Sequence, residues 1–116
     1  MSERIVINQR NGNVVSSRTR YADSWLKRLV GLLTESELGN GQGLWLKPCT
    51  SIHTIGMRFA IDVVFLDEDN CVKKLANSLK PYRFCLSAKG TRSVLELPSG
   101  TISMAGICRG DKLLVQ

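Results

Sequence analysis

Hydrophobic and polar positions alternate with period two along much of the chain, which predicts several short β-strands. RIVIN and NVVSS flank the dipeptide Asn11-Gly12, which is typical of a hairpin turn, so we expect the chain to open with two antiparallel strands. Later strand-like runs are GLWL, CVKKLA, PYRFCL, RSVLEL and KLLV. SGTISMAGI is expected to form one or two helical turns that end near Gly106.

One segment, residues 22–33, has the period of a helix instead. Trp25, Leu29 and Leu33 recur every fourth residue, and cations occupy the opposite face. This pattern predicts one substantial helix whose apolar stripe packs over a sheet.

The run MRFAIDVVFL, residues 57–66, is too apolar for a half-solvated strand and predicts a central strand buried on both faces. Asp62 falls among its apolar positions, where an unpaired carboxylate would be costly. Because side chains alternate along a strand, Asp62 and Arg58 lie on the same face of the predicted strand. We therefore expect the Asp62 carboxylate to bind the side chain of Arg58 or His53.

These elements predict an α+β fold: a mainly antiparallel, strongly curved or barrel-like sheet with the helix of residues 22–33 packed over it. The 116 residues are expected to form a single globular domain. No stretch approaches the roughly 18 to 20 apolar residues of a membrane span. The N-terminus lacks the apolar core of a secretory signal, so we expect a cytoplasmic protein.

Four cysteines, Cys49, Cys71, Cys85 and Cys108, are spaced too widely for paired zinc ligands, and the chain has one histidine. The glycine-rich stretch of residues 39–43 matches neither a P-loop nor a dinucleotide fingerprint and is expected to be a turn. We therefore expect no metal or cofactor. In a reducing compartment the thiols stay free, and Cys71, Cys85 and Cys108 are assigned to packing.

The net charge of +6 comes from one segment, residues 73–92, which has cations and no anion. Its cations are Lys73, Lys74, Lys80, Arg83, Lys89 and Arg92. Tyr82 and Phe84 lie within it at period-two spacing, which suits stacking of bases beside phosphate-binding cations, so nucleic acid or another polyanion is one possible partner. The preferred interpretation is a solvated strand and turn surface whose aromatic rings point into the core.

PCTSIHTIGMRF, residues 48–59, gathers a thiol, an imidazole, hydroxyls and a guanidinium. Cys49, His53 and Asp62 are the residue types of a thiol-dependent enzyme. However, residues 49 and 53 would lie roughly 13 Å apart on an extended strand, and only a tight turn would bring them into contact. No nucleophile signature surrounds Cys49, so catalysis is kept as an alternative rather than as the prediction.

The favoured interpretation of this segment is a binding module with a small-ligand pocket made by His53, Thr54, Arg58 and Asp62. Arg58 would be the fork for a carboxylate or phosphate, and Asp62 would orient it. A purely structural loop, in which Arg58 pairs with Asp62, is the remaining alternative. No protein partner is indicated.

Four segments in order, LKRLVGLL, GLWLKPCTSIHTIGMRFAIDVVFLD, Pro81 and LELPSGTISMAGICRGDKL, resemble the domain-of-unknown-function family 192 over about residues 20–115. Ala60 departs from the proline that many relatives have before the Ile-Asp pair. The resemblance implies a compact, mainly β fold with one packed helix. It implies no established reaction.

Overall fold

The computed structural model describes residues 3–22, 38–54 and 58–116, and this part of the chain contains nine strands and one short helix, α3 (Thr101–Ala105). The strands in chain order are β1 Arg4–Asn8, β2 Val14–Ala22, β3 Gln42–Leu46, β4 Ser51–His53, β5 Ile61–Leu66, β6 Val72–Leu79, β7 Phe84–Leu86, β8 Ser93–Pro98 and β9 Leu113–Val115.

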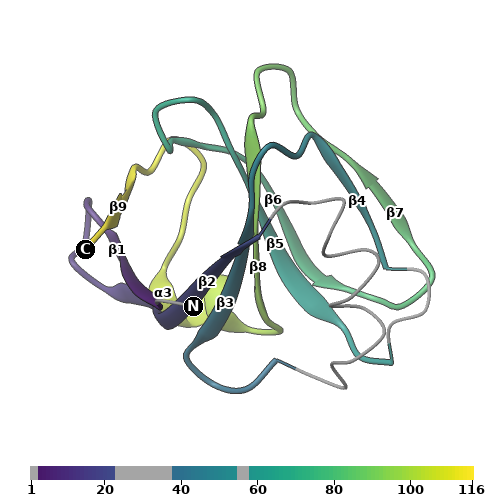
Figure 1. Cartoon of the computed structure of the whole chain (residues 1–116), viewed down its shortest axis with the longest axis horizontal. Helices are drawn as coiled ribbons and strands as arrows, with labels where there is room; N and C mark the ends of the chain where they lie inside the picture. Colours follow the sequence, from purple (N-terminus) through teal and green to yellow (C-terminus); the bar gives the residue numbers. More distant parts are fainter. Residues whose placement is uncertain (1–2, 23–37, 55–57) are drawn as a thin grey trace.

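Seven of the strands form one sheet in the order β6-β5-β8-β3-β2-β1-β9. Adjacent strands in this sheet run antiparallel, except β2 and β3, which run parallel to each other. The remaining two strands, β4 and β7, make a separate antiparallel pair. Figure 1 shows β1 and β9 at one side of the molecule, the β4–β7 pair at the other, and β5 and β8 between them.

The sheet curls until its two edge strands meet at one end. Cys71, just before β6, forms an isolated antiparallel bridge with Lys112, just before β9. The Val72 N–H donates to Asp111 O, and the Gly110 N–H donates to Val72 O, both at 2.8 Å. These bonds satisfy backbone groups that an open edge would leave unpaired. The predicted curved, barrel-like sheet is confirmed.

Strand β5 is buried along its whole length, as predicted, although it lies second from the edge of the sheet and not at its centre. Alternation divides its side chains between two apolar clusters. Val64 and Leu66 pack with the cluster that includes residues of α3, β1 and β9. Ile61, Val63 and Phe65 pack with the cluster that includes residues of β4 and, at its border, β7. The strand begins at Ile61, however, and not at Met57 as the pattern suggested.

Several local predictions are confirmed: the β1–β2 hairpin, the GLWL strand within β3, and a helical turn that ends at Gly106 with φ 64°. The predicted helix of residues 22–33 falls almost wholly outside the described residues, and Ala22 is the last residue of β2. The described chain is a mixed, curved sheet with very little helix, which does not support the α+β assignment. No helix in this part of the chain is long and apolar enough to cross a membrane.

Candidate functional site

Cys49 and Ile52 belong to the core, whereas their neighbours Pro48 and Thr50 are exposed. Cys49 is 6% exposed and packs in the cluster that contains Leu44 and Ile52, with its Sγ 3.0 Å from Ser51 O. Ser51 to His53 then form β4, whose backbone is extended. The His53 side chain lies outside the described residues, so catalysis by Cys49, His53 and Asp62 stays an untested alternative.

Thr54 is fully buried, and its hydrogen bonds stabilise the turn that precedes β7. Its Oγ1 donates to Lys80 O at 2.6 Å and accepts from the Arg83 N–H at 2.9 Å. Its backbone bonds the same turn, since the Thr54 N–H donates to Arg83 O and the Tyr82 N–H donates to Thr54 O. Thr54 therefore positions the backbone of Tyr82 and Arg83.

Asp62 is fully buried and accepts three backbone hydrogen bonds. Its Oδ1 accepts from the Ser78 N–H at 2.8 Å, and its Oδ2 accepts from the N–H groups of Gly100 (3.1 Å) and Ile102 (2.8 Å). One carboxylate thus ties β5 to the end of β6 and to the start of α3. These bonds supply the partner that the sequence required for a buried charge.

The predicted ion pair between Arg58 and Asp62 is wrong. The two ion pairs among the described residues join Arg10 to Asp111 and Arg18 to Glu3. Arg58 is exposed in a bend before β5, so the strand alternation that would place it beside Asp62 does not reach it. The ligand pocket of His53, Thr54, Arg58 and Asp62 stays a prediction, and in the structure Thr54 and Asp62 already bind the main chain.

The basic segment places its aromatic rings in solvent. Tyr82 is 66% exposed and Phe84 is 73% exposed, as is Leu86 two residues later on β7. The interpretation that these rings point into the core is wrong, because Cys85 is the β7 residue that packs against the core, and alternation turns Phe84 and Leu86 outward.

Cations flank these exposed side chains in the sequence. Lys80, Arg83, Lys89 and Arg92 are exposed, whereas Lys73 and Lys74 on β6 are partly buried. The Lys74 Nζ donates to Leu86 O and lies 5.8 Å from the centre of the Phe65 ring, which fixes the end of β7 against β6. The surface therefore combines positive charge with exposed apolar and aromatic side chains.

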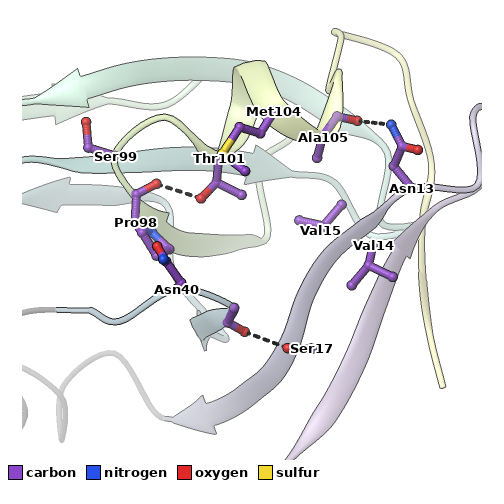
Figure 2. Close-up of a pocket in the computed structure, with 11 residues that line it drawn as sticks. Asn13, Val14, Val15, Ser17, Asn40, Pro98, Ser99, Thr101, Met104 and Ala105 are labelled. Carbon is purple, nitrogen blue, oxygen red and sulfur yellow. Dashed lines mark hydrogen bonds between the residues drawn. The ribbon is translucent and has the colours of Figure 1, made fainter.

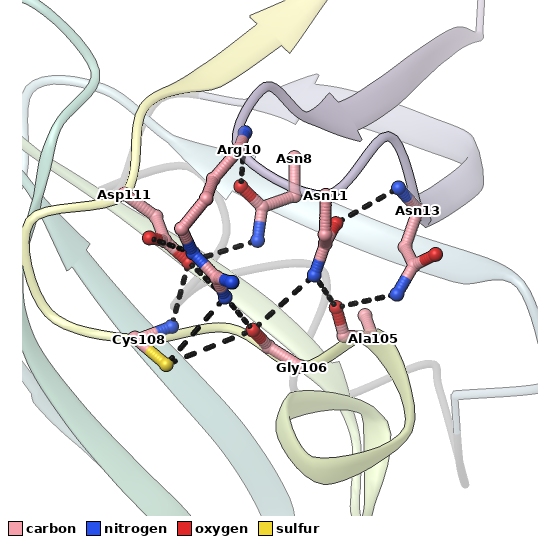
Figure 3. Close-up of polar contacts among 8 residues, drawn as sticks. All are labelled: Asn8, Arg10, Asn11, Asn13, Ala105, Gly106, Cys108 and Asp111. Carbon is pink, nitrogen blue, oxygen red and sulfur yellow. Dashed lines mark hydrogen bonds and ion pairs between the residues drawn. The ribbon is translucent and has the colours of Figure 1, made fainter.

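A polar cluster that the sequence did not reveal joins the β1–β2 turn to the C-terminal region (Figure 3). Asp111, with a side chain only 5% exposed, accepts from Arg10 Nε at 2.7 Å, Asn8 Nδ2 at 2.9 Å and the Cys108 N–H at 2.8 Å. The hydrogen bond from Arg10 is the main reason that the pKa of Asp111 falls from 3.8 to about 2. The Asp111 carboxylate is therefore committed to this cluster.

Cys108 is exposed, so its assignment to packing is wrong, whereas Cys71 and Cys85 are partly buried. The Cys108 Sγ lies 3.6 Å from Arg10 Nη2, at the rim of the Asp111 cluster. We expect Cys108 to be alkylated at neutral pH at least about tenfold faster than Cys49, because reagent reaches an exposed thiol without opening the core. Peptide mass spectrometry after timed iodoacetamide treatment measures both rates.

Denaturing urea provides the control for this labelling, since the two rates should converge once the chain unfolds. Cys108→Ser should remove the fast phase and leave the rest of the labelling unchanged. Native labelling of Cys49 as fast as that of Cys108 would contradict the burial of Cys49.

A second surface feature is a pocket of about 450 Å³ between β2, the Asn40–Gly41 turn and α3 (Figure 2). No pattern in the sequence indicated this pocket. Its lining has no charged side chain and consists of Asn13, Val14, Val15, Ser17, Asn40, Gly41, Pro98, Ser99, Thr101, Met104 and Ala105. Within the lining, Asn13 Nδ2 donates to Ala105 O and Thr101 Oγ1 donates to Pro98 O. The pocket offers neutral polar groups to an uncharged molecule.

Metal ligands do not gather anywhere in the described part of the chain, where no group of three or more His, Cys, Asp or Glu side chains can hold an ion.

A further acid, Glu96 on β8, is 1% exposed between Leu44 and Val63 of the neighbouring strands. The burial of this carboxylate could not be predicted from the sequence, because RSVLEL gives no sign that both faces of the strand are covered.

Solved structures with the same fold include a protein of unknown function from Novosphingobium aromaticivorans DSM 12444, with a TM-score of 0.79 and 24% identity over 97% of this chain and 83% of that one. A putative transcription regulator from Sinorhizobium meliloti 1021 has a TM-score of 0.82 and 21% identity over 97% of this chain and 92% of its own. At these identities the likeness shows the curved-sheet fold alone.

Sequence relatives carry no assigned activity in their names. A UPF0127 protein of Pyrococcus furiosus is 32% identical over 111 residues, which are 93% of this chain and 95% of that protein. A UPF0127 protein of Thermococcus sibiricus is 31% identical over 113 residues, 94% of this chain and 73% of that protein. The model of the DUF192 family, described as an uncharacterized ACR, matches residues 6–115. The chain belongs to the DUF192 family, as the resemblance of its motifs predicted.

Proposed function

We propose that the chain binds single-stranded nucleic acid through the β7 surface, which we define as Tyr82, Phe84 and Leu86 with the flanking cations Lys80 and Arg83. The observation that carries this proposal is the exposure of the two aromatic rings, 66% for Tyr82 and 73% for Phe84. Large apolar side chains exposed together on a surface commonly mark a binding site.

Stacking and charge attraction are both available on the β7 surface. A base stacked on an aromatic ring contributes about 1–3 kcal/mol, and nearby cations bind the phosphates. Lys80 and Arg83 are exposed on either side of Tyr82, and residues 73–92 contain no acidic residue to repel a phosphate. The surface thus suits an anionic polymer that also presents flat apolar groups.

The dimensions of β7 favour a single strand over a duplex. β7 has three residues, and the exposed rings of Phe84 on β7 and of Tyr82 in the turn before it meet bases only when the bases are unstacked and splayed outward. Duplex recognition in the major groove needs a helix or a β-ribbon that enters the groove. The turn before β7 is held by Thr54, so the backbone that carries Tyr82 is ordered before any ligand binds.

Fluorescence anisotropy with labelled single-stranded RNA, single-stranded DNA and duplex DNA tests the proposal. We expect the single strands to bind more tightly than the duplex and to weaken steeply as salt rises. Phe84→Ala should weaken single-strand binding by about 5- to 150-fold, because one stacking contact is lost. Met104→Ala is the matched control, since Met104 is 87% exposed on α3, away from the β7 surface.

Two further probes separate nucleic acid from other anionic partners. Heparin has charge but no bases, so its binding should not depend on Phe84. Vesicles with anionic headgroups should bind less well than the single strands. The proposal is overturned if no oligonucleotide binds at low salt, if Phe84→Ala leaves oligonucleotide binding unchanged, or if vesicles alone bind in a Phe84-dependent way.

A further inference from the structure

An open cleft of about 530 Å³ lies where the first residues of β6 meet two turns. Its lining combines three cations with small or apolar residues and contains no acidic side chain: Val72, Lys73, Ala88, Lys89, Arg109 and Gly110. Lys73 and Lys89 belong to the basic segment. Arg109 is distant from that segment in sequence, and the fold brings it to the same cleft.

Within the part of the chain that the structure describes, the three cations have no counterion. Neither ion pair among residues 3–22, 38–54 and 58–116 involves Lys73, Lys89 or Arg109. The nearest acid in sequence to Arg109 is Asp111, whose carboxylate is committed to Arg10 and its neighbours. Three like charges around one cleft repel one another, and a bound anion would relieve that repulsion.

Hydrogen bonds between backbone groups, and one from a threonine hydroxyl, fix the walls of the cleft. The Gly110 N–H donates to Val72 O and the Val72 N–H donates to Asp111 O, which hold the turn bearing Arg109 against β6. On the other side, Thr91 Oγ1 donates to Ala88 O at 2.7 Å and closes the turn bearing Lys89. Lys73 Cε lies 3.9 Å from the position that a Cβ would occupy on Gly90. The backbone walls of the cleft are therefore formed before a ligand arrives.

We propose that this cleft, defined by Lys73, Lys89 and Arg109, binds a phosphate group. The guanidinium of Arg109 matches two phosphate oxygens at once, and the two lysines add point charges. Resting on the proposed function, the inference makes the cleft the backbone subsite of the same nucleic-acid strand. Ala88 follows the last residue of β7 by two positions, a reach of about 7 Å at most, so the cleft continues from the β7 surface.

Titration with inorganic pyrophosphate, followed by ¹H–¹⁵N NMR at low salt, tests the cleft without nucleic acid. We expect saturable shifts centred on the amides of Lys89, Gly90 and Gly110. Arg109→Ala should raise the dissociation constant at least about fivefold, because the two-oxygen contact is lost. Arg4→Ala is the matched control, since Arg4 is an exposed arginine outside the cleft lining. Shifts centred elsewhere, or unaltered affinity in Arg109→Ala, would overturn the cleft.

Oligonucleotide titrations distinguish this inference from the proposed function. Arg109→Ala should weaken single-strand binding and reduce the salt slope by about one, whereas Phe84→Ala should leave pyrophosphate binding unchanged. If pyrophosphate binds in the cleft and no oligonucleotide binds, the proposed function fails and the cleft stands as a site for a free phosphate anion. If oligonucleotides bind with full salt slope in Arg109→Ala, the inference fails and the β7 surface stands alone.

Discussion

Replacing Asp62 with Ala is expected to lower the free energy of unfolding by about 3–5 kcal/mol, a large part of the total stability of a small domain. The substitution removes the acceptor for three backbone N–H groups, those of Ser78, Gly100 and Ile102. Asp62 is fully buried, so water cannot replace the lost acceptor without opening the structure. Urea denaturation followed by tryptophan fluorescence measures the change.

Two variants bracket this result. Asp62→Asn keeps one acceptor oxygen and is expected to cost about 1–3 kcal/mol, which gives a measurable protein if the alanine variant does not fold. Asp69→Ala changes an exposed aspartate in the turn before β6 and should stay within about 0.5 kcal/mol of the wild type. A loss below about 1 kcal/mol for Asp62→Ala would show that these bonds do not hold α3 to the sheet.

Replacing Asp111 with Ala is expected to cost about 2–4 kcal/mol at pH 7, and the cost should shrink in acid. The pKa of Asp111 is about 2 in the folded protein and 3.8 as a model value. Because the folded pKa is the lower one, this stabilisation is fully present above about pH 5 and is lost as pH falls toward 2. Urea denaturation of both proteins at several pH values between 7 and 2.5 measures the narrowing.

Solvent weakens the interaction between Arg10 and Asp111, because the Arg10 side chain is 52% exposed. The stability lost in acid is limited for this reason. We expect the gap between wild type and Asp111→Ala to narrow by about 1–2 kcal/mol across that range. Asp69→Ala again serves as the control and should show a gap that stays small throughout. A constant gap for Asp111→Ala would mean that its charge contributes no stability and that packing alone explains the loss.

Local patterns predicted the elements whose signal is contained within a few residues. Asn11-Gly12 identified the first hairpin, and the apolar run from Ile61 to Leu66 identified a strand buried on both faces. Burial of Asp62 among apolar neighbours was also predictable, together with its need for a partner. The identity of that partner was not, because backbone N–H groups of Gly100 and Ile102 leave no mark on the sequence.

The orientation of β7 was missed for a different reason. Period-two alternation shows that Phe84 and Cys85 point to opposite sides, but it does not say which side faces the core. Phe84 was expected to be the buried residue, yet the smaller Cys85 packs against the core. The choice depends on β4 and on the turn held by Thr54, which are remote from β7 in sequence.

The phosphate cleft and the Asp111 cluster depend on still longer separations. Asn8 and Asp111 are 103 positions apart, and Arg109 meets Lys73 only because β6 and β9 close the sheet. A charge count along the chain assigned the basic surface to residues 73–92 alone. Arg109 lies far from that segment in the sequence, and only the closure of the sheet brings the two together.

The pairing of β1 with β9 also sets a delay during protein synthesis (Figure 1). The hairpin of β1 and β2 leaves the ribosome early, and β9, which covers the outer edge of β1, follows about a hundred residues later. At about 5–20 residues per second, that edge stays uncovered for roughly 5–20 s. An uncovered strand edge can pair with strands of other nascent chains. The outer edge of β1 is therefore open to such pairing until β9 is made and pairs with it.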